Sequence, residues 1–369
     1  MGNSASALPY SIDNQVGAPH DHNGWALHNG KSTDSAKREV SLFIAKKPDL
    51  VKQPMSPRFP QLTRLVPALH HYNNSRKLRH PHILKVYATL DTDNPTAATT
   101  DGGGMPAAES ASSNSVAKTT GDLIIVTEPC ISLNQWLLSN PTPEQLAWGL
   151  ECLVRGLWFM HNDAKLVHGN LSPTSFYVTR SGDVKLWNFS LVTPVGPNHL
   201  GPTPHFQEWE MACTPDAYRS PERVERRWNH ISNAGIHAMD SYGLGILIDH
   251  WFNGKIPQRL QKAVQRLQTS NIKMRPRLQP LLKCPVFDTP YQKLQLQLEE
   301  IVIQPVEQKI RMWQDLGTSM QMGKVPSDVA LHKILPLLQS SISTICCNES
   351  MLSQDMYRRE GMGFCMFTS

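Results

Sequence analysis

Two short segments near the middle of the chain constrain its fold more than any other feature. Residues 166–175 read LVHGNLSPTS, and residues 184–191 read VKLWNFSL. In each segment, polar residues lie between apolar ones, and the two segments are close together in the sequence. A helix should precede them, because Thr142 and Gln145 have the spacing of a capping box and apolar residues recur every three or four positions up to Met160. We therefore expect a helix from about residue 142, followed by two polar loops.

The first third of the chain has the composition of a sheet. Apolar runs of strand length occur at residues 40–45, 83–90 and 123–127. Residues 91–121, between the last two runs, are rich in Ala, Ser, Thr and Gly, and we expect them to form a disordered insert in a hairpin. A strand-rich first part and a helical remainder predict an α+β fold with two lobes.

Charge, cysteine content and hydropathy exclude several classes of protein. The 36 Lys and Arg against 31 Asp and Glu give a net charge of +5, too small for 369 residues to indicate a nucleic-acid binder by itself. The seven cysteines include no C-x-x-C pair, so we expect neither a disulfide framework nor a zinc module, and a reducing, intracellular environment. No apolar run approaches the length of a membrane-spanning helix.

The N-terminus carries a candidate lipidation signal. The first six residues, MGNSAS, match the M-G-x-x-x-[ST] pattern for myristoylation of Gly2, although a polar, disordered start could contain the same residues. Residues 1–24 lack the apolar core of a secretory signal. One myristoyl chain binds a membrane only marginally, so stable anchoring would need a second signal.

A basic segment could provide that second signal. Residues 50–90 hold seven Lys and Arg and no Asp or Glu. We expect a helix in this segment to carry a basic patch, which would bind anionic lipid or, as the alternative, form an ordinary solvated face. The patch consists of Arg64, Arg76, Lys77 and Arg79.

The two central segments resemble the catalytic loop, H-R-D-L-x-x-x-x-N, and the D-F-G turn of protein kinases. Further on, Ser220-Pro221-Glu222 resembles the A-P-E motif, and residues 79–84 (RHPHIL) resemble a link between the small-lobe helix and the next strand. The resemblance implies a two-lobed kinase-like fold. The residues that would maintain this fold are His168, Phe189, Glu222, Asp240 and Arg275.

The resemblance also implies that the positions of phosphoryl-transfer chemistry are replaced. A kinase needs a strand lysine, a helix glutamate, an aspartate that orients the acceptor hydroxyl, and carboxylate and amide ligands for magnesium. Catalytic residues and metal ligands are therefore not expected in this chain. The degenerate positions are Phe43, His71, Asn170, Ser172, Ser175 and Asn188.

Three interpretations of this pattern remain open. The chain could be a kinase-shaped scaffold without a ligand, a pseudokinase that binds nucleotide without magnesium, or an active kinase with relocated residues. In the second interpretation the hinge residues Glu128, Pro129 and Cys130 would hold the adenine. We expect no cofactor to be required, and ATP binding without magnesium is the alternative.

Among pseudokinases the chain resembles the Scy-like family, the N-terminal kinase-like proteins. The resemblance rests on residues 25–30 (WALHNG), 40–43 (VSLF), 78–81 (LRHP), 126–128 (VTE), 298–301 (LEEI), and 325–328 (VPSD) with 331–338 (LHKILPLL). It implies a non-enzymatic adaptor in vesicle traffic, cytoplasmic with peripheral Golgi or endomembrane association. Vesicle coat or trafficking proteins are the expected partners, with tRNA as a less favoured one.

The resemblance also gives a division of the chain. Members of this family continue through many HEAT repeats, which stack into a solenoid. We expect this chain to contain only the first repeat and to be a truncated form. The expected parts are a disordered start at 1–23, a kinase-like domain at 24–284 with lobes 24–129 and 130–284, a first HEAT repeat at 285–343, and an atypical tail at 344–369.

Overall fold

The computed structural model describes residues 8–16, 24–52, 54–56, 59–94, 99–100, 120–195, 201–235, 237–320 and 325–343. Gly2, most of the insert at 91–121 and the tail at 344–369 lie outside the described residues. The chain divides into two compact units: unit 1 ends at Phe287, and unit 2 comprises residues from Asp288 together with the turn Arg180–Gly182.

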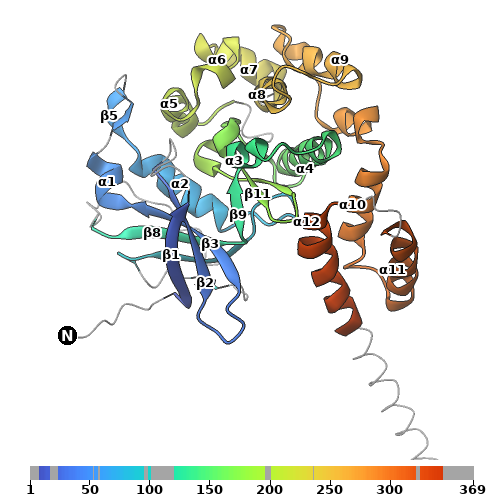
Figure 1. The fold of residues 1–369 in the computed structure, drawn as a ribbon. Coiled ribbons are helices and arrows are strands. Elements are labelled where there is room, and N and C mark those ends of the chain that lie inside the picture. Colours follow the sequence, from blue (N-terminus) through green and yellow to red (C-terminus); the bar gives the residue numbers. More distant parts are fainter. Residues whose placement is uncertain are drawn as a thin grey trace, which may run out of the picture. The chain divides into compact units, whose positions relative to one another are not determined.

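Unit 1 begins with a six-stranded antiparallel sheet in the order β1-β2-β3-β8-β6-β7 (Figure 1). Strands β6 and β8 pair directly, so the polar insert joins two neighbours in this sheet, as expected. The expectation of disorder is wrong for Thr99–Thr100 in the insert, which pair with β6, and for Tyr10–Val16 in the first 23 residues, which pair with β2. Strand β3 is buried on both faces, which explains its continuous apolar run. The strands are β1 (Tyr10–Val16), β2 (Ala26–Ser32), β3 (Glu39–Lys46), β6 (Val86–Asp91), β7 (Thr99–Thr100) and β8 (Asp122–Thr127), with β4 (Pro54–Ser56) and β5 (Phe59–Thr63) as a separate pair.

The rest of unit 1 is largely helical. Helix α4 begins with the predicted capping box, in which Gln145 N–H donates to Thr142 Oγ1 at 3.2 Å and Thr142 N–H donates to Gln145 Oε1 at 2.8 Å. The α+β fold with a sheet-rich and a helical lobe is therefore confirmed. The helices are α1 (Lys47–Lys52), α2 (Leu65–Ser75), α3 (Leu133–Leu138), α4 (Pro143–Asn162), α5 (Pro204–Cys213), α6 (Pro221–Val224), α7 (Trp228–Ala234), α8 (Ala238–Trp251) and α9 (Gln258–Leu267).

Short strands and 3₁₀ turns hold the two central loops in place. Strand β11 follows the first loop and β12 begins the second; the two strands pair with each other, and β9 extends this small sheet. The strands are β9 (Cys130–Ser132), β10 (Leu166–Val167), β11 (Phe176–Thr179), β12 (Val184–Leu186) and β13 (Thr193–Pro194), and the turns are η2 (Pro173–Ser175), η3 (Phe189–Leu191), η4 (Asp216–Tyr218), η5 (Ile272–Met274), η6 (Gln279–Lys283) and η7 (Pro285–Phe287).

The structure corrects the expectation of a basic helix in residues 50–90. Helix α2 contains no Lys or Arg, because Arg64 precedes it as N-cap and Arg76 follows it as C-cap. Lys77 and Arg79 lie beyond the cap. Arg64 and Arg76 are therefore at opposite ends of α2, about 18 Å apart along the axis, and about one third of a turn apart around it at 3.6 residues per turn.

Unit 2 is helical. Lys333 Nζ donates to Gln295 Oε1 at 2.8 Å, and Gln295 is buried, so the last described helical segment packs on α10. No helix in the described part of the chain is long and apolar enough to cross a bilayer. The elements are α10 (Pro290–Glu300), α11 (Val306–Met320), α12 (Ser327–Val329) and the π-helical turn η8 (Ala330–Ile334), with helix continuing over residues 335–343.

Candidate functional site

The loop that resembles a catalytic loop is anchored by one buried carboxylate. Asp240, on α8, accepts hydrogen bonds from the backbone N–H groups of His168 and Gly169, each at 2.8 Å. His161 also contacts Asp240 at 2.8 Å. Burial alone would raise the pKa of Asp240, but these hydrogen bonds, led by that of His161, hold it below its ordinary value. Asp240 therefore fixes the backbone of this loop.

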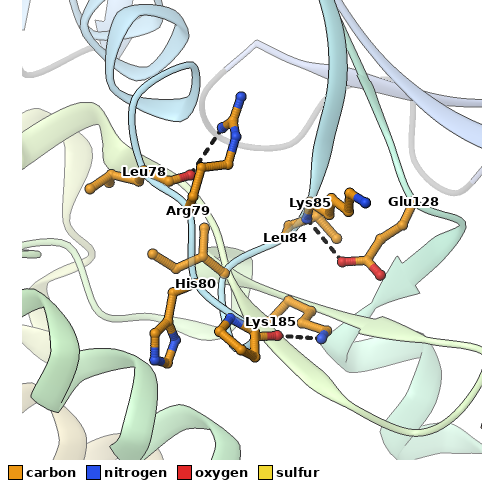
Figure 2. A pocket seen from close by; sticks show the side chains of 9 residues that line it. Leu78, Arg79, His80, Leu84, Lys85, Glu128 and Lys185 are labelled. Carbon is orange, nitrogen blue, oxygen red and sulfur yellow. Dashed lines mark hydrogen bonds between the residues drawn. The ribbon is translucent and has the colours of Figure 1, made fainter. Parts of the chain in front are cut away.

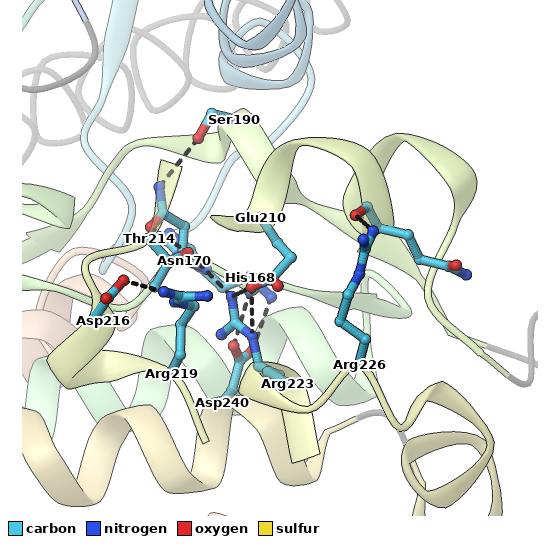
Figure 3. A network of polar contacts seen from close by, with 12 residues as sticks. His168, Asn170, Ser190, Glu210, Thr214, Asp216, Arg219, Arg223, Arg226 and Asp240 are labelled. Carbon is cyan, nitrogen blue, oxygen red and sulfur yellow. Dashed lines mark hydrogen bonds and ion pairs between the residues drawn. The ribbon is translucent and has the colours of Figure 1, made fainter. Parts of the chain in front are cut away.

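Asn170 stands where the kinase resemblance places the catalytic aspartate. Its side chain is fully buried, and both ends of the carboxamide are occupied (Figure 3). Nδ2 donates to Ser190 Oγ at 3.2 Å, and Oδ1 accepts from Thr214 Oγ1 at 3.1 Å. A carboxamide that is buried and bonded at both ends cannot orient a substrate hydroxyl.

The network extends into residues that the sequence motifs did not single out. Arg223 Nη2 donates to Thr214 Oγ1 at 3.0 Å and forms a buried ion pair with Glu210 at 3.1 Å. Gly169 has φ +74°, and a Cβ there would lie 2.5 Å from the Phe206 ring, so no side chain fits where the kinase pattern has an arginine. At the position of the kinase arginine, the ring of Phe206 occupies the space that a side chain on residue 169 would need.

The positions of the magnesium ligands are occupied by internal hydrogen bonds. Ser175 Oγ donates to the Asn170 carbonyl, and Ser172 Oγ lies 2.9 Å from Thr174 Oγ1. Asn188 adopts a left-handed backbone with φ +60°, and its Oδ1 accepts from Ser190 Oγ at 2.8 Å. Among the described residues, no cluster of His, Cys, Asp or Glu could hold a metal ion.

Aromatic side chains fill the space between β3 and the two central loops. Phe43, at the position of the kinase lysine, is fully buried. Its ring lies 4.4 Å from that of Trp187 and 4.8 Å, edge to face, from that of Tyr177. His71 contacts Trp187 edge to face at 4.4 Å and Trp25 at 5.3 Å. These five residues, the aromatic cluster, occupy the region where a bound nucleotide would contact the strand lysine.

His71 takes the expected place of the helix glutamate and has a structural role there. Its Nδ1 accepts a hydrogen bond from the Phe189 backbone N–H at 2.9 Å, so the ring is neutral with its proton on Nε2. Burial, with smaller contributions from neighbouring histidines, lowers the pKa of His71 to about 3. Position 71 therefore joins α2 to the loop at Phe189 without a charge.

We predict that the protein loses stability in mild acid. Burial lowers the pKa values of His71, His82 and His168, whereas the unfolded chain protonates near pH 6.5. Stability from these groups is therefore complete above about pH 6.5 and falls as the pH drops below it, by up to about 1.4 kcal/mol per pH unit for His71, whose folded pKa is about 3.

Urea unfolding between pH 7.5 and 5 measures this slope. His71→Asn is the matched variant, because an Asn Oδ1 can still accept the Phe189 N–H but does not titrate. It should reduce the slope by up to about 1.4 kcal/mol per pH unit, the contribution of one histidine. An unchanged slope in the variant, or a flat wild-type profile, contradicts the buried neutral state of His71.

The main-chain groups of the hinge residues form hydrogen bonds with the neighbouring side chains of Ser41 and Thr127. An adenine held at Glu128, Pro129 or Cys130 would need main-chain donors and acceptors. However, the Cys130 N–H donates to Ser41 Oγ at 3.0 Å, and the Cys130 carbonyl lies 3.4 Å from the same hydroxyl. The Glu128 carbonyl lies 3.1 Å from Thr127 Oγ1. Burial raises the pKa of the Cys130 thiol to about 12, so this thiol is no nucleophile at neutral pH.

A pocket of about 430 Å³ lies beside the link between α2 and β6 (Figure 2). Buried Leu78, Ile83 and Leu84 contribute apolar walls. Glu128 Oε1 accepts from the Lys85 backbone N–H at 2.9 Å, and Lys185 Nζ donates to the Pro81 carbonyl. The pocket contains none of the degenerate kinase positions.

The residues expected to maintain the kinase fold are brought together in the large lobe. Arg275 and Glu222 form a bidentate ion pair with N–O distances of 2.6 and 2.9 Å, and both side chains are buried. The fully buried Phe189 packs edge to face on His168. Among the described residues of unit 1, the contacts expected to hold the two central loops in place are therefore present.

No protein-family model matches the chain. It is 24% identical over 363 residues to "Probable inactive serine/threonine-protein kinase scy1" of Dictyostelium discoideum, covering 95% of this chain and 39% of that protein. It is 23% identical over 395 residues to "SCY1-like protein 2" of Homo sapiens, covering 92% of this chain and 38% of that protein. The chain therefore spans about two fifths of the length of these relatives.

Among solved structures, the crystal structure of Cex1p matches with a TM-score of 0.59 and 18% identity, covering 97% of this chain and 58% of that chain. This match shows a shared fold. The similarity to scy1 and SCY1-like protein 2 extends over nearly the whole chain and is consistent with the Scy-like family.

Proposed function

We propose that this chain is a kinase-fold scaffold that binds no nucleotide, transfers no phosphate and acts as an adaptor. The observation that carries this proposal is the burial of Phe43 between Tyr177 and Trp187, where a kinase needs a cation and space for phosphate. The closed hinge at Cys130 and the bonded carboxamide of Asn170 support the same conclusion.

The adaptor would act in intracellular vesicle traffic. This part of the proposal rests on the resemblance to the Scy-like family and on the likeness to the Scy1-like relatives. The chain would be cytoplasmic, associate peripherally with Golgi or other endomembranes and bind a vesicle coat or trafficking protein. A myristoyl group on Gly2 would give the first membrane signal.

Membrane fractionation of cells that express the tagged chain tests this role. We expect the chain in the endomembrane fraction, and coat subunits should co-purify with it after detergent extraction. Gly2→Ala should move most of the chain to the supernatant, because the acyl group is lost. Ala7→Ser, outside the lipidation pattern, is the matched control. Unchanged fractionation of Gly2→Ala, or purification without any coat subunit, contradicts the proposed role.

A further inference from the structure

The large lobe carries a second basic segment. Between Asp249 and Asp288 the chain has eight Lys and Arg and no Asp or Glu. Arg275 is buried against Glu222, and the other seven side chains are exposed, which gives this segment a local exposed charge of 8 − 1 = +7. The seven exposed cations are Lys255, Arg259, Lys262, Arg266, Lys273, Arg277 and Lys283.

Three of these cations form a stripe along α9. The opposite side of this helix is buried through Leu260, Val264 and Leu267, and the helix packs on α8. Arg259, Lys262 and Arg266 follow at spacings of three and four, so they share the exposed side. Within the described residues, none of the three has an ion-pair partner.

Neighbouring segments extend the stripe at both ends of α9. Cys284 Sγ donates to the Arg259 carbonyl at 3.2 Å, which brings Lys283 to the first turn of the helix. At the other end, Arg275 Nε donates to the Thr269 carbonyl at 3.0 Å and holds the η5 turn close to the helix terminus. Met274, in that turn, is 63% exposed and directly follows the exposed Lys273.

An exposed aliphatic side chain among cations fits a lipid surface better than a nucleic acid. Cations contact anionic headgroups while an apolar side chain enters the layer beneath them. Nucleic-acid surfaces usually add aromatic side chains on which bases stack. In this segment the aromatic residues are Trp251, Phe252 and Phe287, and all are buried or half-buried.

We propose that the stripe Arg259, Lys262 and Arg266, together with the η5 turn at Met274, binds the anionic headgroups of phospholipid membranes. We call this face the α9 surface. The inference rests on the proposed adaptor function, because it supplies the second membrane signal that a single acyl chain needs. It also assigns that signal to the large lobe, since α2 itself carries no Lys or Arg and the cations around it lie at its two ends.

Vesicle sedimentation of the full chain, produced without the myristoyl group, tests the proposal. Vesicles of phosphatidylcholine alone are compared with vesicles containing phosphatidylserine at a ratio of about 7:3. Arg259→Gln/Lys262→Gln/Arg266→Gln should weaken binding to the anionic vesicles about 100-fold, since each cation near such a surface contributes about 1 kcal/mol, or about fivefold. Met274→Ser should weaken it about tenfold.

The matched control is Arg76→Gln/Lys77→Gln/Arg79→Gln, which removes the same charge from the end of α2 and should change binding less than about twofold. Thermal unfolding confirms that each variant is folded. Equal binding to both vesicle types, or a larger loss in the α2 variant, overturns the proposal.

A labelled tRNA serves as the second probe. The wild type could bind tRNA through the α9 cations and fail to bind vesicles. That result also overturns the proposal and assigns the surface to RNA. Nucleotide titration tests the scaffold independently of both probes, so failure of the α9 surface is distinguishable from failure of the proposed function.

Discussion

Phe43→Ala should lower the free energy of unfolding by about 4 kcal/mol in urea denaturation, because it removes a fully buried ring that packs on Tyr177 and Trp187. The ring has neighbours from both lobes, so the space it leaves cannot collapse easily. Leu138→Ala is the control: that side chain is 82% exposed and its loss should cost less than about 1 kcal/mol.

Phe43→Lys extends the test, since it restores the residue type that the kinase pattern has at this position. The ammonium would be buried against the rings of Tyr177 and Trp187, so we expect at least the same loss of stability. If either substitution at position 43 lowers the free energy of unfolding by less than about 1 kcal/mol, Phe43 is not tightly packed in the aromatic cluster.

Arg275→Met should cost about 3–5 kcal/mol, because it leaves the Glu222 carboxylate buried without its bidentate partner. Burial raises the pKa of Glu222, but the hydrogen bonds and charge of Arg275 outweigh this and lower it overall. The pair therefore stabilises the fold fully above about pH 4.5, and its contribution is lost as the pH falls through the lowered pKa.

Urea denaturation at pH 7 and at low pH checks this pH dependence. The loss of unfolding free energy caused by Arg275→Met should be smaller in acid. Arg275→Lys keeps the charge but not the two parallel hydrogen bonds, so its cost should be intermediate. Glu222→Gln/Arg275→Met should recover part of the loss. Equal costs for all three variants would show that the position matters for packing alone.

Local patterns in the sequence were sufficient to predict the elements that rest on neighbouring residues. The spacing of Thr142 and Gln145 gives the capping box of α4, and the apolar runs correspond to β3, β6 and β8. The prediction that the helix in residues 50–90 carries the basic patch is wrong. Its basic residues lie at and beyond the caps, and the helix ends where Ser75 and Arg76 turn toward the next strand, which no local pattern encodes.

The filling of the site depends on contacts between distant residues and could not be read from motifs. Substitutions at Phe43 and Asn170 predict what is lost, but not that Trp187 and Tyr177 occupy the space or that Ser41 bonds Cys130 across 89 residues. The α9 surface left a signal that a charge count could have found, because no acid interrupts residues 250–287.

Nucleotide titration of the full chain tests the central claim most directly. We predict that ATP and ADP at about 1 mM, with and without Mg²⁺ or Mn²⁺, produce no heat of binding in calorimetry and no rise in the unfolding temperature. A nucleotide bound with a Kd of about 10 µM would add about 2.7 kcal/mol at that concentration and raise the unfolding temperature by several degrees. Such a rise would contradict the proposed scaffold, in which the aromatic cluster and the hydrogen-bonded hinge stand in place of a nucleotide site.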